Sequence, residues 1–395
     1  MRPGAGIAGS VMSRTWDVIV VGARVAGAAT ARLLAQAGLD VLCLDRAPRG
    51  TDTLSTHGLM RGGVIQLARW GLLDALRVVG TPAIHRAVFH YGDDAVAVSI
   101  RPAGGVDALY APRRTVLDPL LVDEAARAGA QVEFSAQVRR LTRDDTGRVT
   151  GVVVTDRRRR LERVERAHLV VGADGRDSLV AAAVGAEPTA DGRHAGAYLY
   201  GYWADLDADG YEWFYSADGL AAGMIPTNDS QVCVFVGGSP ARLRAEWRGA
   251  SQATFDRLAE AVGLADRLRT ATRIGSLRHV RDLPPGYLRR AYGRGWALVG
   301  DAGHWLDPIS THGMTSALRD ADLLSTAVLA GGNQCGPDLA GYQAERDRLS
   351  LPMLELSDQI ASYTWDLGQV RHLLRSMASA MADEVEAITE LAAIA

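Results

Sequence analysis

The segment at residues 17–30, DVIVVGARVAGAAT, constrains the fold of this chain more than any other feature. Its first residues predict a buried strand, Gly22 predicts a tight turn, and Gly27 with a run of alanines predicts a helix packed closely on that strand. Such a unit presents free N–H groups at a helix N-terminus to an anion, as in dinucleotide pyrophosphate binding. Arg24 replaces the middle glycine of the G-x-G-x-x-G pattern, so its side chain must point away or add its charge to the phosphate contact.

An acidic residue stands where a bound ribose would need it. A second apolar run, residues 41–44, predicts a strand that ends at Asp45, 23 residues after Gly22. This is close to the spacing of the carboxylate that binds the adenosine ribose in dinucleotide-binding folds. An ordinary βαβ turn without a ligand is the alternative interpretation of these two features.

Composition agrees with an enzyme and argues against nucleic-acid binding. The chain has 395 residues, which suits two interleaved domains. It is 48% hydrophobic with a net charge of −3, so neither disorder nor a nucleic-acid surface is indicated. The basic run 157–160 continues into interleaved glutamates and predicts a solvated hairpin. Because every one of the 43 basic residues is arginine, no mechanism here can use a lysine amine.

The cysteines, the apolar stretches and the N-terminal segment further narrow the class of protein. Cys43, Cys233 and Cys335 are far apart and odd in number, so we expect neither a disulfide framework nor a metal site. No apolar stretch reaches membrane-spanning length. Residues 1–14 lack a sustained apolar region, so we expect a disordered leader, a second plausible start at Met12, and a cytoplasmic protein.

Hydrophobic periodicity predicts the remaining elements. Three helices and three early groups of strands are expected, followed by an alternating, aromatic-rich sheet and a helical C-terminal part with an apolar stripe. The stripe could pack on the chain itself or on a second subunit, giving a monomer or a homodimer. The expected helices lie at 26–37, 62–76, 113–130 and 362–395, and the strands at 88–100, 132–141, 149–164 and 195–237.

Two further motifs strengthen the first. In HLVVGADGRDS, a strand ends in Gly172, and Asp174 and Gly175 follow before a helix start. In WALVGDAGH, a strand ends in Gly300-Asp301, and the run at 307–315 leads into another helix. An aspartate just past a buried strand can accept hydrogen bonds from ribityl or ribose hydroxyls, and a helix N-terminus can face a negative ring edge. Either motif alone could be simple strand-end punctuation.

With these three motifs, the chain resembles the flavoprotein aromatic hydroxylases, or class A flavin monooxygenases, whose superfamily includes flavin-dependent halogenases and geranylgeranyl reductases. The resemblance covers roughly residues 15 to 330 and implies an α/β plus α+β fold: a Rossmann-like FAD-binding domain interleaved with a β-sheet substrate domain, then C-terminal helices. The expected FAD-binding domain is 15–85, 111–188 and 289–330. The expected substrate domain is 86–110 and 189–288, and the C-terminal helical region is 331–395.

The resemblance also assigns residues to a non-covalent FAD. The Gly-rich turn implies the pyrophosphate site, Asp45 the adenosine ribose site and Asp301 the ribityl site. Relatives often place an arginine near position 57 for the pyrophosphate, and this chain has Arg61 four residues further on. The full expected cofactor set is Gly22, Ala23, Arg24, Gly27, Asp45, Arg46, Arg61, Arg114, Val138, Asp174, Gly300, Asp301, Gly313 and Met314.

The chemistry implied by the resemblance is oxygen insertion. NADPH or NADH reduces the flavin without a separate nicotinamide domain, O2 forms a C4a-hydroperoxide, and the distal oxygen goes to an aromatic or polycyclic small molecule. Halogenases need a tryptophan pair and a lysine, both missing here. The run Ala221, Ala222 and Gly223, with Pro308 opposite, predicts an open pocket for a bulky substrate, although the small residues could instead serve tight strand packing.

Two histidines are candidates for proton transfer. His57 and His312 fall in segments expected beside the flavin ring, and imidazole exchanges protons near neutral pH. His304 is expected only to cap or pack. Two other functions stay open at this point: an FAD-dependent oxidase or reductase that moves hydride without inserting oxygen, and a flavin-binding protein that has lost turnover.

Overall fold

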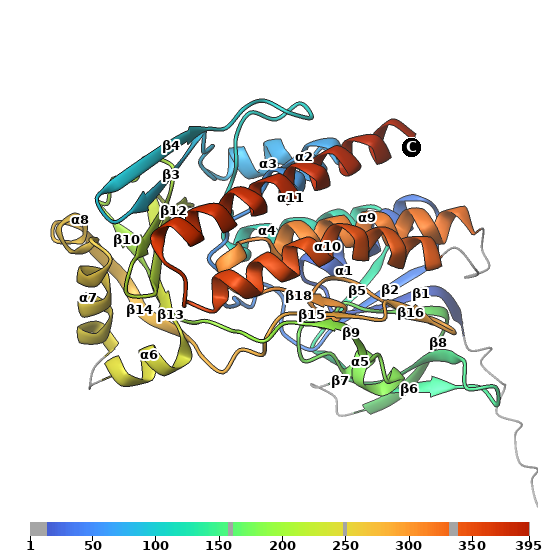
Figure 1. The fold of residues 1–395 in the computed structure, drawn as a ribbon. Coiled ribbons are helices and arrows are strands. Elements are labelled where there is room, and N and C mark those ends of the chain that lie inside the picture. The colour runs from blue at the N-terminus through green and yellow to red at the C-terminus, as the bar shows by residue number, and fades with distance from the viewer. Residues whose placement is uncertain (1–13, 157–160, 248–250, 332–338, 395) are drawn as a thin grey trace, which may run out of the picture.

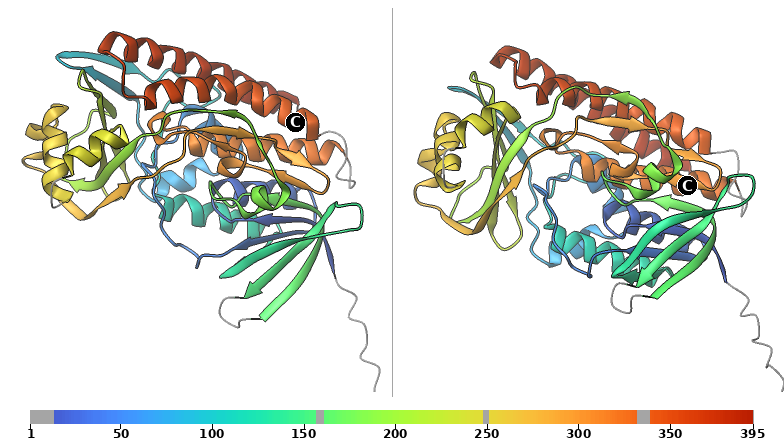
Figure 2. Two further views of the ribbon diagram at one scale, coloured as in Figure 1. Left: turned by 60° about the horizontal axis from the view of Figure 1, so that its bottom comes forward. Right: turned by 90° about the horizontal axis from the view of Figure 1, so that it is seen from below.

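The structure is a computed structural model that describes residues 14–156, 161–247, 251–331 and 339–394. Residues 1–13 of the expected leader, with Met12, lie outside these ranges, as do the basic run 157–160 and Cys335. Within the described residues, the strands form three sheets of eight, seven and three strands. Helices pack against both large sheets, and the chain passes between these sheets several times (Figures 1 and 2).

The eight-stranded sheet has a parallel centre. β1 (Thr15–Val21) pairs in parallel with β2 (Val41–Asp45) on one side and β8 (Leu161–Gly172) on the other. These central strands are apolar on both faces because both faces are covered, as parallel sheets require. The remaining strands are β5 (Gln131–Phe134), β6 (Ala136–Arg143), β7 (Val149–Asp156), β16 (Tyr292–Gly293) and β17 (Trp296–Leu298).

Three helices cover one face of this sheet. α1 (Val25–Gln36) contacts both α4 (Arg114–Arg127) and α9 (Gly313–Ala330), and all three share one apolar core with the sheet. The opposite face packs against α5 (Leu179–Val184) and against β6 and β7. These two antiparallel strands belong to the same sheet but branch from it at β8. This arrangement directs the N-termini of α1 and α9 toward the carboxyl ends of β1 and β2.

The seven-stranded sheet carries the aromatic residues seen in the sequence. Its order is β14-β10-β13-β12-β11-β3-β4, so the early hairpin joins strands that lie more than a hundred residues later. One face packs against the C-terminal helices and the other against three short helices, which lie on its outer side in Figure 1. The strands are β3 (Arg86–Tyr91), β4 (Asp94–Ser99), β10 (Ala197–Ala204), β11 (Tyr211–Ser216), β12 (Leu220–Thr227), β13 (Gln231–Gly238) and β14 (Thr272–Val280).

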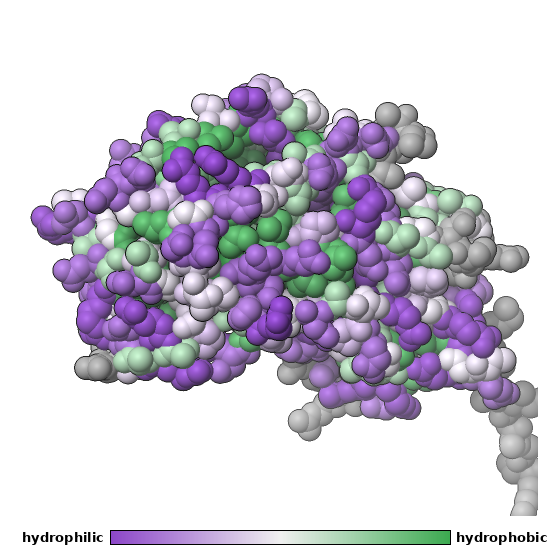
Figure 3. All heavy atoms as spheres, in the orientation of Figure 1, coloured by the Kyte–Doolittle hydropathy of each residue, from purple (hydrophilic) through white to green (hydrophobic). Residues whose placement is uncertain are grey.

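A small antiparallel sheet and two long helices complete the architecture. The small sheet joins β9 (Pro188–Asp191), β15 (Tyr287–Arg289) and β18 (His304–Trp305). α10 (Leu339–Ala361) and α11 (Leu367–Ile394) pack on each other, and α11 also contacts the seven-stranded sheet at β11. The apolar stripe of the last helix therefore faces the chain's own body. The face in Figure 3 shows hydrophilic residues spread among smaller hydrophobic areas.

The expected fold class is confirmed, with local corrections. The helix expected at 62–76 is two helices, α2 (Arg61–Arg69) and α3 (Leu73–Val78), because the chain turns at Gly71 with a φ of +72°. The sequence interpretation also missed three helices that cover the seven-stranded sheet. They are α6 (Pro240–Glu246), α7 (Ser251–Ala261) and α8 (Ala265–Leu268).

Two further findings concern the cysteines and the possibility of a membrane-spanning helix. Cys43 and Cys233 are buried free thiols on strands of different sheets, and burial raises the pKa of each. Among the described residues, none of the helices combines the length and the apolar character that crossing a membrane would require.

Candidate functional site

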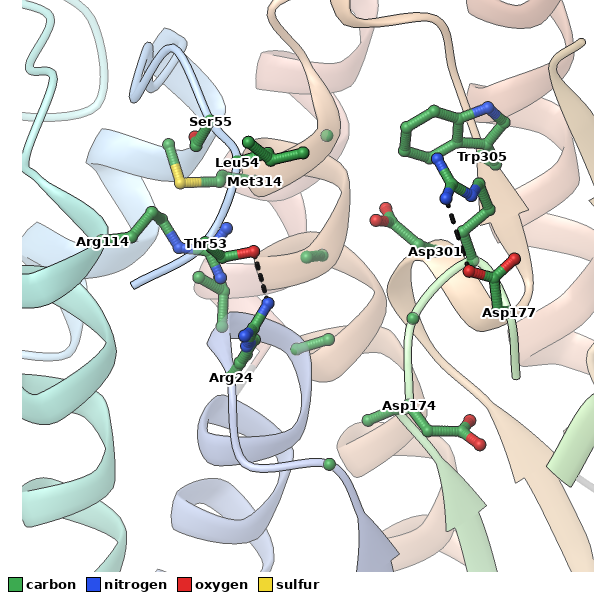
Figure 4. A pocket seen from close by; sticks show the side chains of 18 of the residues that line it. Arg24, Thr53, Leu54, Ser55, Arg114, Asp174, Asp177, Asp301, Trp305 and Met314 are labelled. Atoms are coloured by element: carbon green, nitrogen blue, oxygen red, sulfur yellow. Dashed lines mark hydrogen bonds and ion pairs between the residues drawn. The ribbon is translucent and has the colours of Figure 1, made fainter. Parts of the chain in front are cut away.

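A cavity of about 480 Å³ lies between the two large sheets. It is lined by the carboxyl ends of β1 and β2, by the N-termini of α1 and α9, and by residues of β10, β13 and β14. The crevice beyond the carboxyl ends of parallel strands is where α/β folds bind ligands. Figure 4 shows Arg24 and Thr53 on one side of the cavity, with Asp301 and Trp305 on the other.

The Gly-rich turn is as tight as the sequence predicts. Gly22 has a φ of +104°, and a Cβ added there would lie 2.3 Å from the Ala173 carbonyl oxygen. A Cβ on Gly27 would lie 1.8 Å from the Gly22 carbonyl oxygen, so the start of α1 sits directly on the turn. Gly22 lines the cavity, whereas Ala23 and Gly27 do not. Gly27 therefore serves the packing that shapes the turn.

Asp45 connects the turn to the end of β2. Its Oδ2 accepts a hydrogen bond from Ala23 N at 2.9 Å, and its Oδ1 accepts one from Ala47 N at 2.7 Å. The carboxylate also lines the cavity and has about four acceptor sites, so two remain for a ligand hydroxyl. Arg46 and Val138 line the same end of the cavity.

The arginines expected at the cofactor take different positions. Arg24 points toward Thr53 on the same side of the cavity, and its Nη1 donates to Thr53 Oγ1 at 2.5 Å (Figure 4). Arg114 lines the cavity and is held by Asp118 one turn further along α4, at 2.8 and 3.0 Å. Arg61 starts α2 and does not line the cavity. In the structure, Arg24 contacts the 50–57 segment through Thr53 and also lines the cavity.

The N-terminus of α9 is open toward the cavity. His312 is its N-cap residue and makes no side-chain capping bond, so the first N–H groups of the helix keep their donor capacity. Gly313 and Met314 line the cavity there. Gly300 does not, but a Cβ at this position would lie 2.8 Å from Ala26 Cβ, which explains why the approach of α1 needs glycine.

Asp301 is the least satisfied acid of the site. Its carboxylate lines the cavity and has no hydrogen-bond partner among the described residues. Burial raises the pKa of this carboxyl from 3.8 to about 6, although Arg114 and Arg176 pull it down. A ligand hydroxyl would supply the missing hydrogen bond.

Asp174 has a structural task. It accepts hydrogen bonds from Ser178 Oγ at 2.5 Å and Val180 N at 3.2 Å, which secures the start of α5. Burial raises the pKa of this carboxyl. Asp174 still lines the cavity, but Figure 4 shows its side chain at the lower edge, away from Arg24 and Met314.

His57 lies buried in the cavity wall as a neutral imidazole. Its Nε2 lies 2.6 Å from the Tyr202 hydroxyl, and its Nδ1 has no partner in the described part of the chain. Burial, and then Arg113 and Arg114, lower the pKa of His57 to about 3. Its φ of +69° is unusual for a residue with a side chain, and such strain concentrates at functional sites.

His312 also lines the cavity, and its Nε2 lies 2.7 Å from Glu384 Oε2 of α11. His304 does not line the cavity. Burial and Arg319 lower the pKa of His304 well below its ordinary value, so its ring is neutral. It packs beside Arg319 and Ser350.

The small residues of β12 do not reach the cavity. Ala222 faces the helix-covered side of the sheet, where it packs in one cluster with Phe255 of α7. A Cβ on Gly223 would lie 2.4 Å from Phe235, so this glycine makes room for aromatic neighbours rather than for a ligand. Ala221, Ala222 and Gly223 therefore line no part of the cavity, whereas Pro308 does.

The cavity wall on the side of the seven-stranded sheet is instead aromatic and comes from other strands. Tyr198, Tyr200 and Phe235 line the cavity together with Trp305 and Leu306. The sequence interpretation used the alternating tyrosines only as evidence for a β-sheet. Period-two alternation also places Tyr198, Tyr200 and Tyr202 on one face of that sheet. This shared face could have indicated that they form part of a cavity wall.

A cavity at the carboxyl ends of a parallel sheet, between two uncapped helix N-termini, defines a dinucleotide-binding protein. A family model described as an FAD binding domain matches residues 15–356. Digeranylgeranylglycerophospholipid reductase 2 from Methanopyrus kandleri is 29% identical over 316 residues, 77% of this chain and 74% of that protein. Menaquinone reductase from Mycolicibacterium smegmatis is 28% identical over 345 residues, 81% of this chain and 78% of that protein.

Solved structures show the same fold. PqsL, described as a probable FAD-dependent monooxygenase from Pseudomonas aeruginosa, matches with a TM-score of 0.79 and 20% identity, covering 92% of this chain and 100% of that one. The myxobacterial chondrochloren halogenase CndH matches with a TM-score of 0.74 and 22% identity, covering 86% and 80%. This chain is an FAD-dependent oxidoreductase that belongs to the family defined by this FAD binding domain. Its fold is the one found in PqsL and in the halogenase CndH.

Proposed function

We propose that this protein is a monooxygenase that uses NADPH or NADH and O2 to hydroxylate an aromatic or polycyclic small molecule. The observation that carries the proposal is the continuity of the cavity. It runs from the Gly22 turn, past the open N-terminus of α9, to the aromatic wall of the seven-stranded sheet. One end thus offers donors and acceptors for a dinucleotide, and the other offers ring faces to an apolar substrate.

The unsatisfied groups of the cavity fit a non-covalent FAD. We assign the pyrophosphate to the turn at Gly22 and the N-terminus of α1, with Arg24 and Arg114 as nearby positive charge. We assign the adenosine ribose to Asp45 and the ribityl chain to Asp301, whose carboxylate lacks a protein partner among the described residues. Bound FAD supplies redox chemistry that no side chain here can provide.

The chain's own residues would then organise the reaction. The N–H groups of Gly313 and Met314 are oriented to stabilise negative charge at the N-terminus of α9. Tyr198, Tyr200 and Phe235 hold the substrate and exclude water, with Pro308 facing them. His57 and His312 line the cavity, and we assign to one of these imidazoles the task of holding or moving a proton.

We propose two domains, each built around one of the two large sheets. The segments 15–85, 111–188 and 289–330 form the proposed FAD-binding domain, and 86–110 with 189–288 form the proposed substrate domain. The absence of lysine argues against the halogenase branch of the superfamily. The open choice is between oxygen insertion and hydride transfer alone.

Isotope labelling tests that choice. The purified protein is reduced with NADPH or NADH under anaerobic conditions, mixed with oxygen-18 gas, and offered a phenol, a naphthol and a hydroxyanthraquinone as probes. We expect a bleached flavin spectrum on reduction and one labelled oxygen atom in a hydroxylated probe. Full flavin reoxidation with hydrogen peroxide as the sole product, or saturation of a double bond in a polyprenyl probe, would favour the oxidase or reductase alternative.

A further inference from the structure

The hydroxyl of Tyr198, on the aromatic wall of the cavity, is tied on two sides. It donates a hydrogen bond to Asp307 Oδ1 and accepts one from the hydroxyl of Tyr363 at 3.2 Å. Tyr363 lies in the turn between α10 and α11, and all three residues are buried. Burial, and then Asp307, raise the pKa of Tyr198 well above its ordinary value, so the phenol keeps its proton and stays a donor. Because that single proton is committed to Asp307, Tyr198 serves the cavity with its ring.

The carboxylate of Asp307 receives three hydrogen bonds. Besides Tyr198, its Oδ1 accepts from Ile309 N at 3.0 Å, and its Oδ2 accepts from Gly196 N at 2.7 Å. Burial raises the pKa of this carboxyl, and the three hydrogen bonds act in the opposite direction. An amide has one acceptor oxygen, so an asparagine here would turn its N–H group toward at least one of the three donors. Asp307 therefore joins the start of β10 to the turn at 307–310 in a way that a neutral residue of the same shape cannot.

Two glycines leave room for the Tyr198 ring to lie against the sheet. Gly237 of β13 is the cross-strand partner of Tyr198, and a Cβ there would lie 2.4 Å from Tyr198 Cδ1. A Cβ on Gly196 would lie 2.2 Å from the Tyr198 hydroxyl oxygen. A methyl group at either position would therefore displace the ring. Because the sheet lies beneath the ring, and Asp307 and Tyr363 hold its hydroxyl end, we expect the displacement to carry the ring toward the cavity.

We propose that Asp307 and Gly237 are positioning residues for Tyr198, and that the ring they hold against the sheet sets the largest ring system that this end of the cavity admits. The proposal rests on the proposed function, in which this end binds an aromatic or polycyclic molecule. Phe235 meets the Tyr198 ring edge-on, with ring centroids 6.2 Å apart, and both rings line the cavity as one wall. A change of one methylene group in an apolar pocket alters binding by about 10-fold or more, so a small shift of this wall is measurable.

A crystal structure of Gly237→Ala tests the ring position without any substrate. We expect the Tyr198 ring to lie further from the sheet and closer to the centre of the cavity than in the wild type. Gly238→Ala is the matched control on the same strand, because a Cβ there would lie 2.9 Å from Leu220 Cδ2 on the opposite, helix-covered face of the sheet. This control should leave the Tyr198 ring in place.

Titration of the FAD-loaded proteins with phenol and with a hydroxyanthraquinone, followed through the flavin absorbance, measures the consequence for binding. In Gly237→Ala we expect the Kd of the hydroxyanthraquinone to rise about 10-fold or more and that of phenol to rise less than about threefold. Asp307→Asn releases the ring from its tether, so we expect a smaller shift in the same direction. Tyr198→Phe already lacks the tethered hydroxyl, so adding Asp307→Asn to it should change the ratio of the two Kd values no further.

The results distinguish failure of this inference from failure of the proposed function. An unmoved ring in Gly237→Ala, or a Kd ratio no different from that of Gly238→Ala, overturns the inference. An effect of Asp307→Asn that persists undiminished in Tyr198→Phe also overturns it, because Asp307 would then act on the probe directly. If Gly237→Ala does not fold, this comparison of single and double variants decides.

The binding measurements do not depend on which reaction the protein catalyses. A shifted Kd ratio without hydroxylation of any probe would retain the inference and remove the proposed reaction. If the FAD-loaded wild type binds neither probe, the proposed substrate class is wrong, and the ring position in the crystal structure of Gly237→Ala then decides the positioning role alone.

Discussion

Replacing Asp301 by Asn should weaken FAD binding and at the same time stabilise the apo-protein. The two effects have opposite signs because the carboxylate is poorly satisfied without a ligand. Burial raises its pKa from 3.8 to about 6, and the described residues supply no hydrogen bond to it. A neutral amide of the same shape avoids the desolvation of a charge but is a weaker acceptor for a ribityl hydroxyl.

The magnitudes follow from the shift and from the strength of charged hydrogen bonds. A shift of roughly two pKa units corresponds to at most about 3 kcal/mol in the free energy of unfolding. As pH rises from about 4 to 6 the unfolded chain ionises first, so wild-type apo-protein loses stability relative to Asp301→Asn, and the full difference is present above pH 6. For FAD, exchanging a charged for a neutral hydrogen-bond acceptor removes about 1–1.5 kcal/mol of binding free energy. This corresponds to an increase in Kd of about 5- to 12-fold. Asp301→Ala should remove about 1.5–3 kcal/mol.

Denaturant titration of the apo-proteins at pH 4, 6 and 8 measures the first effect, and fluorescence titration with FAD measures the second. Asp177→Asn is the matched control, because Asp177 lies at the same cavity but is 81% exposed (Figure 4). It should alter neither quantity appreciably. An unchanged FAD Kd in Asp301→Asn, or an apo-protein less stable than the wild type at pH 8, would refute the assignment of Asp301 to the ribityl chain.

Three further outcomes are expected. Asp45→Ala should weaken FAD more than FMN in parallel titrations, because FMN lacks the adenosine ribose; equal losses would place Asp45 outside the nucleotide site. Gly27→Ala should destabilise the protein by about 1–3 kcal/mol or more, measured by thermal unfolding, because the new methyl group would clash with the Gly22 carbonyl; a normal Tm would contradict the close approach of α1 to the turn. Ala222→Trp should also lower Tm by crowding Phe255, while the KM for a bulky substrate stays unchanged in the folded fraction; a selective loss of large substrates would show that β12 faces the cavity after all.

Local sequence patterns predicted much of the fold because local physics dictates those parts. The turn at Gly22 requires a positive φ and a bare Cα, and only glycine meets both demands. The strand before it is apolar on both faces because helices α1, α4 and α9 cover one side and α5 with β6 and β7 covers the other. The break at Gly71 was missed because a helix-compatible apolar spacing continues through it, and one glycine inside such a pattern does not reveal its φ.

The half of the cavity at the Gly22 turn was predictable for the same reason, and the half at the seven-stranded sheet was not. A strand–turn–helix is one contiguous segment, so the cavity residues Gly22 and Arg24, and Asp45 at the end of the next strand, can be found by spacing alone. The opposite wall is assembled from strands whose sheet order does not follow the chain. The run Ala221–Gly223 suggested open space, but the neighbouring strands fill that space with Trp213 and Phe235, which a single strand's sequence does not show.

Glu384 illustrates the limit most clearly. In the sequence it is an acid in a helix rich in charged residues, and such an acid is ordinarily solvated. Its burial depends on the packing of α11 against α2 and α10, which brings its side chain to His312 and Arg319 at the start of α9, at least 65 residues earlier in the chain. A buried carboxylate is tolerated only where partners satisfy it, and one of those partners lines the cavity. The burial of Glu384 therefore arises from tertiary packing, and no local pattern in the sequence around it records the contacts with His312 and Arg319.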